Sequence, residues 1–424
     1  MNIINIIEKK KRREVLSEEE IKYVVNGFLS KEILDSQMSS LLMTIYFNGM
    51  NEEETYYLTD AMLNSGSTID LSKIEGITVD KHSTGGVGDK VSLILLPIVS
   101  SCGIKVPKMS GRSLGHTGGT IDKLESIPGF RTSMSIDYFI EQVNEIGMGI
   151  ISQTFNMVPA DKKIYALRSI TGTTDSIPLI ASSIMSKKLA SGASKIVIDV
   201  KVGEGALVKN LEEARDLSKR MIDIGERAGR KVVCLLTNMD YPLGKNIGNV
   251  LEVEEAINVL DGKGTEDLKS LVLELASIMI SIGKNISREE AYLEAKEALE
   301  SGRALNKFIE FVKYQGGNLE LMEEATDIKE FKCKKSGYIT NIDARGLADL
   351  IVNIRSKEKV DYKTGIVLNH QVGEYIEKSE KILDLYLDEQ ADLSGIDVEK
   401  IIENCFTIEI EKPNPTKLIY EVIE

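Results

Sequence analysis

The sequence predicts an α/β protein made of a small all-helical domain, a larger α/β domain with a mainly parallel sheet, and a C-terminal α+β subdomain of barrel-sandwich type. Apolar residues recur at helical spacing through the first 65 positions, which indicates packed helices. From about Gly76 onward, β-rich runs alternate with glycine-rich turns and helical stretches, the pattern of βαβ crossovers. After residue 330, short alternating segments favour a small antiparallel unit.

Two capping boxes mark helix starts in the N-terminal part. Ser17 with Glu20 is followed by one apolar face, and Asn51 with Glu54 repeats the signal before a helix that should end near Gly66. The apolar residues after the first box are Ile21, Val24, Val25, Phe28 and Leu29.

The strands of the expected sheet alternate with turns and helices along the chain. The β-rich runs are residues 77–79, 104–106, 195–202 and 231–236. Residues 159–189 are again helical and polar, so we expect them to rejoin the first helices in space. The expected domains are residues 1–66 with 160–190 (α domain), 70–158 with 191–330 (α/β domain) and 331–424 (C-terminal α+β subdomain).

Charge and cysteine usage narrow the class of partner. The 424 residues carry a net charge of -14, which argues against nucleic acid, although a few local cations can still bind one small anion. The basic run at residues 9–13 is interpreted as a solvated helix face.

The start of the chain lacks the features of a signal peptide, and no run is long enough for a membrane span. Four widely separated cysteines favour buried thiols, and we expect a cytoplasmic protein.

A glycine-rich turn between a strand and a helix is the first candidate site. Residues 80–92, DKHSTGGVGDKVS, lead into an apolar helix at residues 91–101, so backbone N–H groups and a helix N-terminus are presented to an anion. The turn is not a P-loop, because Asp89 separates Gly88 from Lys90. A glycine turn that only packs helix on strand is the alternative for this segment alone.

A second loop, within residues 108–125, follows the next strand. Because ligands of parallel sheets bind outside the carboxyl ends of the strands, the two loops should converge on one site. Two lysines would then offset the charge of a phosphate dianion while hydroxyl groups orient it. The expected phosphate-binding residues are Lys81, Ser83, Ser92, Lys108, Ser110 and Thr120. His116, inside this loop, is interpreted as structural support.

These two loops carry a family resemblance. Residues 110–125, SGRSLGHTGGTIDKLE, resemble the signature of the thymidine and pyrimidine nucleoside phosphorylases, and residues 81–89 resemble the family's other conspicuous stretch. The similarity continues in order through residues 165–168, 175–188, 199–206 and 249–255, so it covers essentially the whole chain.

The resemblance implies a homodimer in which a pyrimidine-binding α domain closes on a phosphate-binding α/β domain. By position, Arg168, Ser183 and Lys187 match the family's pyrimidine-binding residues, and His82 matches a histidine that faces the base. Ser183 and Lys187 are four apart, so on a helix they share a face. The alternatives without a function are that Arg168 forms a surface ion pair and that Lys187 occupies a solvated position on a helix.

The activity implied by the resemblance is the reversible phosphorolysis of uridine, thymidine and deoxyuridine, in nucleoside salvage, to free base and α-(deoxy)ribose 1-phosphate. Inorganic phosphate is the nucleophile and co-substrate, and no organic cofactor is expected. His82, Arg168 and Lys187 are the expected catalytic donors to the departing base. A thymidine-specific phosphorylase is the alternative within the family.

Some relatives hold a potassium ion beside the phosphate loop, and here the sequence departs from them. The matching positions are Gly88, Lys90, Leu243, Asn246 and Glu255. Relatives carry a neutral residue where this chain has Lys90. Either backbone carbonyls and Glu255 still hold the ion, or the Lys90 ammonium takes its place.

Two other classes remain for comparison. A phosphoribosyltransferase of the anthranilate type would need an acidic magnesium-binding motif and would lack the pyrimidine residues. A purely nucleoside-binding or interaction role is opposed by the lysines and the arginine expected to do chemistry, which are Lys81, Lys108, Arg168 and Lys187.

Overall fold

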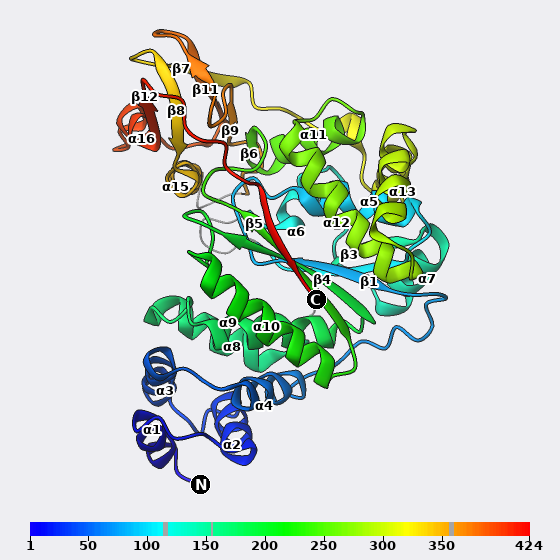
Figure 1. Ribbon diagram of the computed structural model, residues 1–424, viewed down its shortest axis with the longest axis vertical. Coiled ribbons are helices and arrows are strands. Elements are labelled where there is room, and N and C mark those ends of the chain that lie inside the picture. Colours follow the sequence, from blue (N-terminus) through cyan, green and yellow to red (C-terminus); the bar gives the residue numbers. More distant parts are fainter. Residues whose placement is uncertain (113–117, 154–155, 356–359) are drawn as a thin grey trace.

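The computed structural model describes residues 1–112, 118–153, 156–355 and 360–424. Figure 1 shows helices at the N-terminal end, a sheet with helices on both faces in the middle, and a small β-rich unit at the opposite end. This arrangement confirms the predicted fold class, with a helical part, an α/β part with a mainly parallel sheet and an antiparallel C-terminal part.

The helical end is formed by two groups of helices that are far apart in sequence. Both predicted capping boxes are present at their helix starts. The two later helices pack against α2, α3 and α4, and the left-handed Gly172 (φ 65°) ends the first of them. The helices are α1 (Ile3–Lys11), α2 (Glu18–Leu29), α3 (Asp35–Asn48), α4 (Glu52–Leu63), α8 (Pro159–Thr171) and α9 (Ile177–Ala190).

One basic residue at this end is not where the sequence analysis placed it. The interpretation of residues 9–13 as a solvated face is wrong for Lys10, which is 3% exposed. Its Nζ lies 2.6 Å from Oε1 of Glu54, and the same oxygen accepts a hydrogen bond from Leu16 N. The ammonium is therefore an internal partner of α4, because a buried carboxylate needs a counter-charge.

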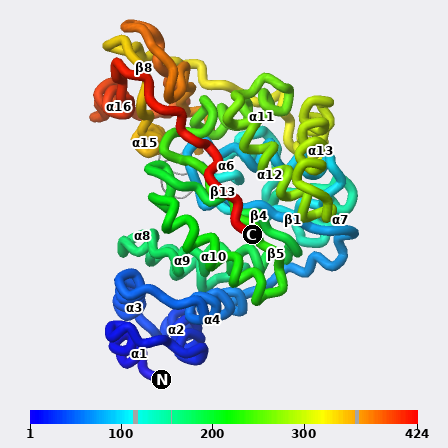
Figure 2. The backbone as a smooth tube through the Cα atoms, viewed as in Figure 1, coloured from blue at the N-terminus to red at the C-terminus, as the bar shows by residue number. Residues whose placement is uncertain are grey.

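The central sheet is parallel except at one edge. Its strand order is β1, β4, β5, β13, and the last strand runs antiparallel to β5. A parallel pair, β2 and β3, continues from β1 through the bridge Thr78 to Lys105. In Figure 2 the C-terminal segment, in red, runs from the C-terminal unit back along the sheet. The strands are β1 (Val79–Ser83), β2 (Val106–Ser110), β3 (Met148–Ser152), β4 (Lys195–Val202), β5 (Lys231–Asn238) and β13 (Ile419–Ile423).

Helices cover both faces of this sheet, and the alternation of side chains decides which residues meet. On one face of β4, Ile196, Ile198 and Val200 pack against α9 and α10. On the other face, Val197 packs with Val79 and the α5 and α12 helices. The helices are α5 (Val91–Ser101), α6 (Thr120–Glu125), α7 (Ile136–Ile146), α10 (Leu211–Arg227), α11 (Asn249–Leu260), α12 (Glu266–Lys284), α13 (Arg288–Glu300) and α14 (Arg303–Tyr314).

Because successive strand residues point to opposite faces, β1 divides its polar residues between two environments. Lys81 and Ser83 share the α5 face with Val79, whereas Asp80 and His82 face the helical end. The strand thus supplies one set of side chains to each half of the molecule.

The C-terminal unit is antiparallel and has its own core. Val87 of the glycine turn is buried in that core, so the unit also packs on the first candidate loop. Its elements are β6 (Asn246–Ile247), β7 (Asp327–Lys332), β8 (Gly337–Ile342), α15 (Ala344–Ile354), β9 (Gly365–Leu368), β10 (Tyr375–Ile376), β11 (Lys381–Leu387), α16 (Val398–Cys405) and β12 (Phe406–Glu409). The short 3₁₀ helix η1 (Leu319–Leu321) precedes this unit and packs on the core of the α/β part.

No single helix in the described ranges has both the length and the apolar composition needed to cross a membrane. The pair α12 and α13 meets those criteria only jointly and is bent by 118°. Most of α12 is core, since its apolar side chains are buried against α5 and α13.

Candidate active site

The glycine turn after β1 has a backbone that glycine adopts at two positions where other residues would be strained. Gly85 and Gly88 adopt φ values of 100° and 71°, a region that favours glycine. A Cβ on Gly88 would lie 2.7 Å from the carbonyl oxygen of Leu243, so only glycine lets the two backbone segments approach this closely. Ser83 ends β1 and Ser92 is the second residue of α5, which places both predicted phosphate ligands around the N-terminus of that helix.

Lys81 lies on the same face as this turn. Its side chain is completely buried, and its Nζ is 3.7 Å from Oδ2 of Asp199. The Asp199 carboxylate offsets part of the ammonium charge, and the N-terminus of α5 adds a partial positive charge at the same end of the sheet. The predicted role of Lys81 in holding an anion fits this position.

The second loop approaches the first through two lysines. Lys108 is buried on β2, and its Nζ donates a hydrogen bond to the carbonyl oxygen of Lys81. Lys123 of α6 donates to the carbonyl oxygens of Asp89 (3.1 Å) and Gly118 (3.0 Å), one from each loop. Lys123 also pairs with Glu252 at 3.0 Å. The two loops therefore lie together, as their positions after neighbouring strands predict.

The remaining phosphate candidates are at the ends of their elements. Ser110 is the last residue of β2, and Thr120 is the first residue of α6. His116, which the sequence analysis interpreted as loop support, lies outside the described residues.

On the helical side, Lys187 and Ser183 form a connected donor pair. Lys187 Nζ lies 2.7 Å from Ser183 Oγ, so the two share a face of α9 as their spacing predicts. The same Nζ lies 2.5 Å from Oδ2 of Asp161, a buried residue of α8. The side chain of Lys187 is 21% exposed, and the alternative of a freely solvated lysine is wrong.

Arg168 is buried rather than on the surface, so the alternative of a surface ion-pair partner is also wrong. Its side chain is 1% exposed. Its guanidinium donates to three backbone carbonyl oxygens of the segment that leads from α8 into α9: Thr173 at 3.0 Å, Thr174 at 2.7 Å and Leu179 at 3.1 Å. Burial lowers the pKa of Arg168, although neighbouring acidic groups oppose the shift. Arg168 thus ties the end of α8 to the start of α9, and three of its five N–H groups are engaged in these contacts.

His82 connects the two halves. Burial lowers its pKa well below the ordinary value, and the charges of Lys188, Lys108, Lys187 and Lys81 act in the same direction. His82 lies opposite Ile198 of β4, on the face of the sheet that α9 covers, so the imidazole lies between the sheet and the helical side. A neutral imidazole carries one N–H donor and one acceptor nitrogen.

The sequence analysis missed several members of this site. Asp161 precedes Tyr165 and Arg168 by four and seven positions, so one face of α8 carries all three. The Tyr165 ring lies 5.4 Å from the Arg168 guanidinium carbon and 5.7 Å from Lys187 Nζ. That helical spacing was a usable signal. The carboxylates of Asp80 and Asp199 gave no comparable signal, because their partners are distant in sequence.

The Lys90 ammonium lies among the residues that match the potassium site of relatives. Its side chain is fully buried, and its Nζ donates to the carbonyl oxygens of Leu243 and Asn246 at 2.8 Å and lies 2.5 Å from Oε2 of Glu255. Glu255 also accepts hydrogen bonds from the backbone of Lys245 and Asn246. The oxygens expected to hold the ion therefore already surround an ammonium group.

Comparisons with known proteins agree with this architecture. Residues 4–66 match the helical bundle domain of a glycosyl transferase family, residues 75–305 match its a/b domain, and residues 338–408 match the pyrimidine nucleoside phosphorylase C-terminal domain. The chain is 47% identical to pyrimidine-nucleoside phosphorylases of Staphylococcus haemolyticus and Geobacillus stearothermophilus, with 100% of each chain covered.

A solved structure shows the same fold at lower identity. The anthranilate phosphoribosyltransferase of Thermus thermophilus aligns with a TM-score of 0.59 and 18% identity, over 73% of this chain and 98% of that one. This similarity shows the fold alone, because at this sequence identity the activity of one protein cannot be assigned to the other.

Proposed function

The chain belongs to the pyrimidine-nucleoside phosphorylases, and on this premise we propose that it cleaves uridine, deoxyuridine and thymidine with inorganic phosphate. The observation that carries the proposal is the position of His82 between two groups of side chains. Lys81 and Lys108 lie on the strands to one side, and Lys187 with Ser183 lies on α9 to the other. One nucleoside and one phosphate can react where these groups face each other.

The proposed reaction is a direct displacement. A phosphate oxygen forms a bond to C1′ of the sugar while the bond from C1′ to the base nitrogen breaks, and the electron pair moves into the base. The protein then has to stabilise negative charge on the base, which Lys187 and Arg168 do through charged N–H donors. His82 is neutral near pH 7 and contributes one further hydrogen bond.

Positioning supplies the second contribution. Holding phosphate and nucleoside in the reactive geometry can lower a barrier by about 7 to 11 kcal/mol. The phosphate side and the base side are on different parts of the molecule, so we propose that closure of the α domain onto the α/β domain brings them together.

The direct test is a substrate panel. Purified protein with orthophosphate is expected to release base from uridine, deoxyuridine and thymidine and to leave cytidine intact, with the α-anomer of the sugar phosphate visible by proton NMR. Turnover of thymidine but not uridine would support the thymidine-specific alternative. No release of base from any of them, or a β-anomer, contradicts the proposal.

Phosphate use should depend on pH through Lys108. Burial lowers the pKa of this lysine to about 7, against the opposing charge of Asp80 and together with Lys188 and Lys81. The ammonium is therefore charged below about pH 7 and neutral above it, so kcat/KM for phosphate should fall as pH rises through that value. Lys108→Arg, whose guanidinium stays charged, should remove this limb of the profile while phosphate itself ionises as before. An unchanged profile in the arginine variant would contradict the assignment.

We propose that the enzyme needs no potassium ion, because Lys90 supplies the positive charge internally. Its Nζ already contacts Leu243 O, Asn246 O and Glu255, and a potassium ion at the same oxygens would meet the ammonium charge. The residues present therefore do not fit the ion. We propose no organic cofactor either, since phosphate is the nucleophile.

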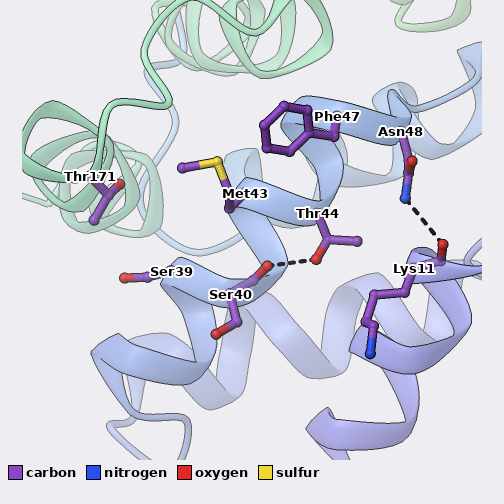
Figure 3. Close-up of a pocket in the computed structure, with 8 residues that line it drawn as sticks. All are labelled: Lys11, Ser39, Ser40, Met43, Thr44, Phe47, Asn48 and Thr171. Atoms are coloured by element: carbon purple, nitrogen blue, oxygen red, sulfur yellow. Dashed lines mark hydrogen bonds between the residues drawn. The ribbon is translucent and has the colours of Figure 1, made fainter.

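We also propose a homodimer that forms through α3. Figure 3 shows Phe47, Met43 and Ser40 along one side of this helix, beside Lys11 of α1 and Thr171 of α8. Phe47 is 74% exposed, and Ile170 on the adjoining α8 is 81% exposed. An apolar surface rimmed by small polar residues suits a second copy of the chain, which buries the same face twice.

The oligomeric state tests this surface. Light scattering after size exclusion should give twice the 46.9 kDa chain mass for the wild type, and Phe47→Glu should shift it to the monomer. Leu293→Glu, at an exposed apolar position of α13, is the matched control and should remain dimeric. A monomeric wild type, or a dimeric Phe47→Glu variant, contradicts the proposed interface.

The state of the four cysteine thiols supports a proposal for the cellular compartment. Cys102, Cys234, Cys333 and Cys405 are all buried and unpaired. We propose that the protein works in the reducing cytoplasm, where such thiols persist.

A further inference from the structure

A second buried ammonium group lies beside Lys81 on the neighbouring strand. Lys201 of β4 is completely buried, and strand alternation places it on the α5 face with Asp199, which pairs with Ser83 of β1. Its backbone N–H donates to Thr84 Oγ1 at 2.8 Å, so the residue lies directly against the start of the glycine turn.

The two ammonium groups share one carboxylate oxygen. Oδ2 of Asp199 is 2.8 Å from Lys201 Nζ and 3.7 Å from Lys81 Nζ, while Oδ1 accepts a hydrogen bond from Thr237 at 2.6 Å. Among the described residues, neither Lys81 Nζ nor Lys201 Nζ has a hydrogen-bond acceptor of good geometry. A buried ammonium group without a hydrogen-bond acceptor destabilises the fold, and a bound anion would supply the missing acceptor.

The shared carboxylate brings the two ammonium groups to one place. Lys81 and Lys201 approach Oδ2 of Asp199 from neighbouring strands, on the face of the sheet that Ser83 also shares. Lys81 and Ser83 are predicted phosphate ligands. Lys201 therefore lies beside the position expected for the same anion.

We propose that Lys201 is a further phosphate-binding residue, oriented by Asp199 and acting beside Lys81. The inference rests on the proposed function, since it names an additional ligand for that co-substrate. A purely structural ion pair with Asp199 is the alternative. It predicts a change in stability with no change in phosphate affinity.

The experiment compares Lys201→Gln and Lys201→Arg with the wild type, and uses Lys209→Met, at a 44% exposed position, as the control. Binding of inorganic phosphate is measured by calorimetry on the free enzyme, and KM is measured separately for phosphate and for nucleoside. Lys201→Gln should weaken phosphate binding by about 10- to 100-fold and leave the nucleoside KM within about twofold. Lys201→Arg should recover part of the affinity, because it keeps the charge.

The outcomes separate this inference from the function itself. Wild-type phosphorolysis is assayed first, and its absence counts against the proposed function. If the wild type is active and Lys201→Gln, shown to be folded by circular dichroism, binds phosphate as tightly as the wild type, Lys201 is not a ligand. Failure of both the Gln and the Arg variants to fold likewise overturns the inference, since the lysine would then serve the fold.

Discussion

Replacing Lys187 with methionine is expected to lower kcat/KM for thymidine phosphorolysis by about 10²- to 10³-fold. Lys187 Nζ is held by Asp161 at 2.5 Å and Ser183 at 2.7 Å, so the ammonium is oriented before the substrate arrives. Methionine has a similar shape and no charge, and it removes a donor to the negative charge that develops on the departing base. The loss should fall mainly on kcat, because the charge exists only as the bond to the base breaks.

Two further variants make this result specific. Lys296→Met, at a 49% exposed position on α13, should keep wild-type kinetics. Asp161→Asn keeps Lys187 but removes its anionic partner, and should cause a smaller loss. If Lys187→Met retains kcat/KM within about twofold of the wild type, Lys187 does not act on the base.

Replacing Lys90 with methionine should destabilise the protein by about 3 to 5 kcal/mol in the free energy of unfolding. Lys90 and Glu255 form a buried pair at 2.5 Å, with side chains 0% and 8% exposed. Removing the ammonium leaves a buried carboxylate and two inward carbonyl oxygens without their counter-charge. Chemical denaturation followed by circular dichroism measures this loss.

Potassium distinguishes the roles of this lysine. The wild type should show equal activity in potassium chloride and in choline chloride at the same ionic strength. Lys90→Thr leaves space among the same oxygens, so potassium should restore part of its stability and activity, whereas the larger choline cation should not. Activation of the wild type by potassium would show that the ion binds even with Lys90 present, and the proposal would be wrong.

Short-range signals in the sequence were sufficient for much of the fold. The capping boxes at Ser17 and Asn51 form because their hydrogen bonds join residues three apart. The helix at Val91–Ser101 has the predicted bounds, since its apolar run is continuous. β1 and β2 each begin two residues later than predicted, as a strand boundary depends on pairing with neighbours.

Two strands that pair with the predicted strands of the α/β part, β3 and β13, were not predicted, for a related reason. β3 (Met148–Ser152) is a short apolar run that becomes a strand only by pairing with β2. β13 (Ile419–Ile423) follows the C-terminal unit in sequence and returns to pair with β5. Neither pairing leaves a local pattern, because the partner strands are far away along the chain.

The sequence by itself determined the fold class, the two loops and the kinds of side chain that each carries, because capping, periodicity and loop position are properties of neighbouring residues. Only the tertiary structure decided what the charged residues do. Lys10 is buried against Glu54, Arg168 is turned onto backbone carbonyls, and Lys90 meets a carboxylate 165 positions away. A buried charge persists only where a partner of opposite charge or a hydrogen-bond acceptor reaches it, and the folding of distant segments sets that distance.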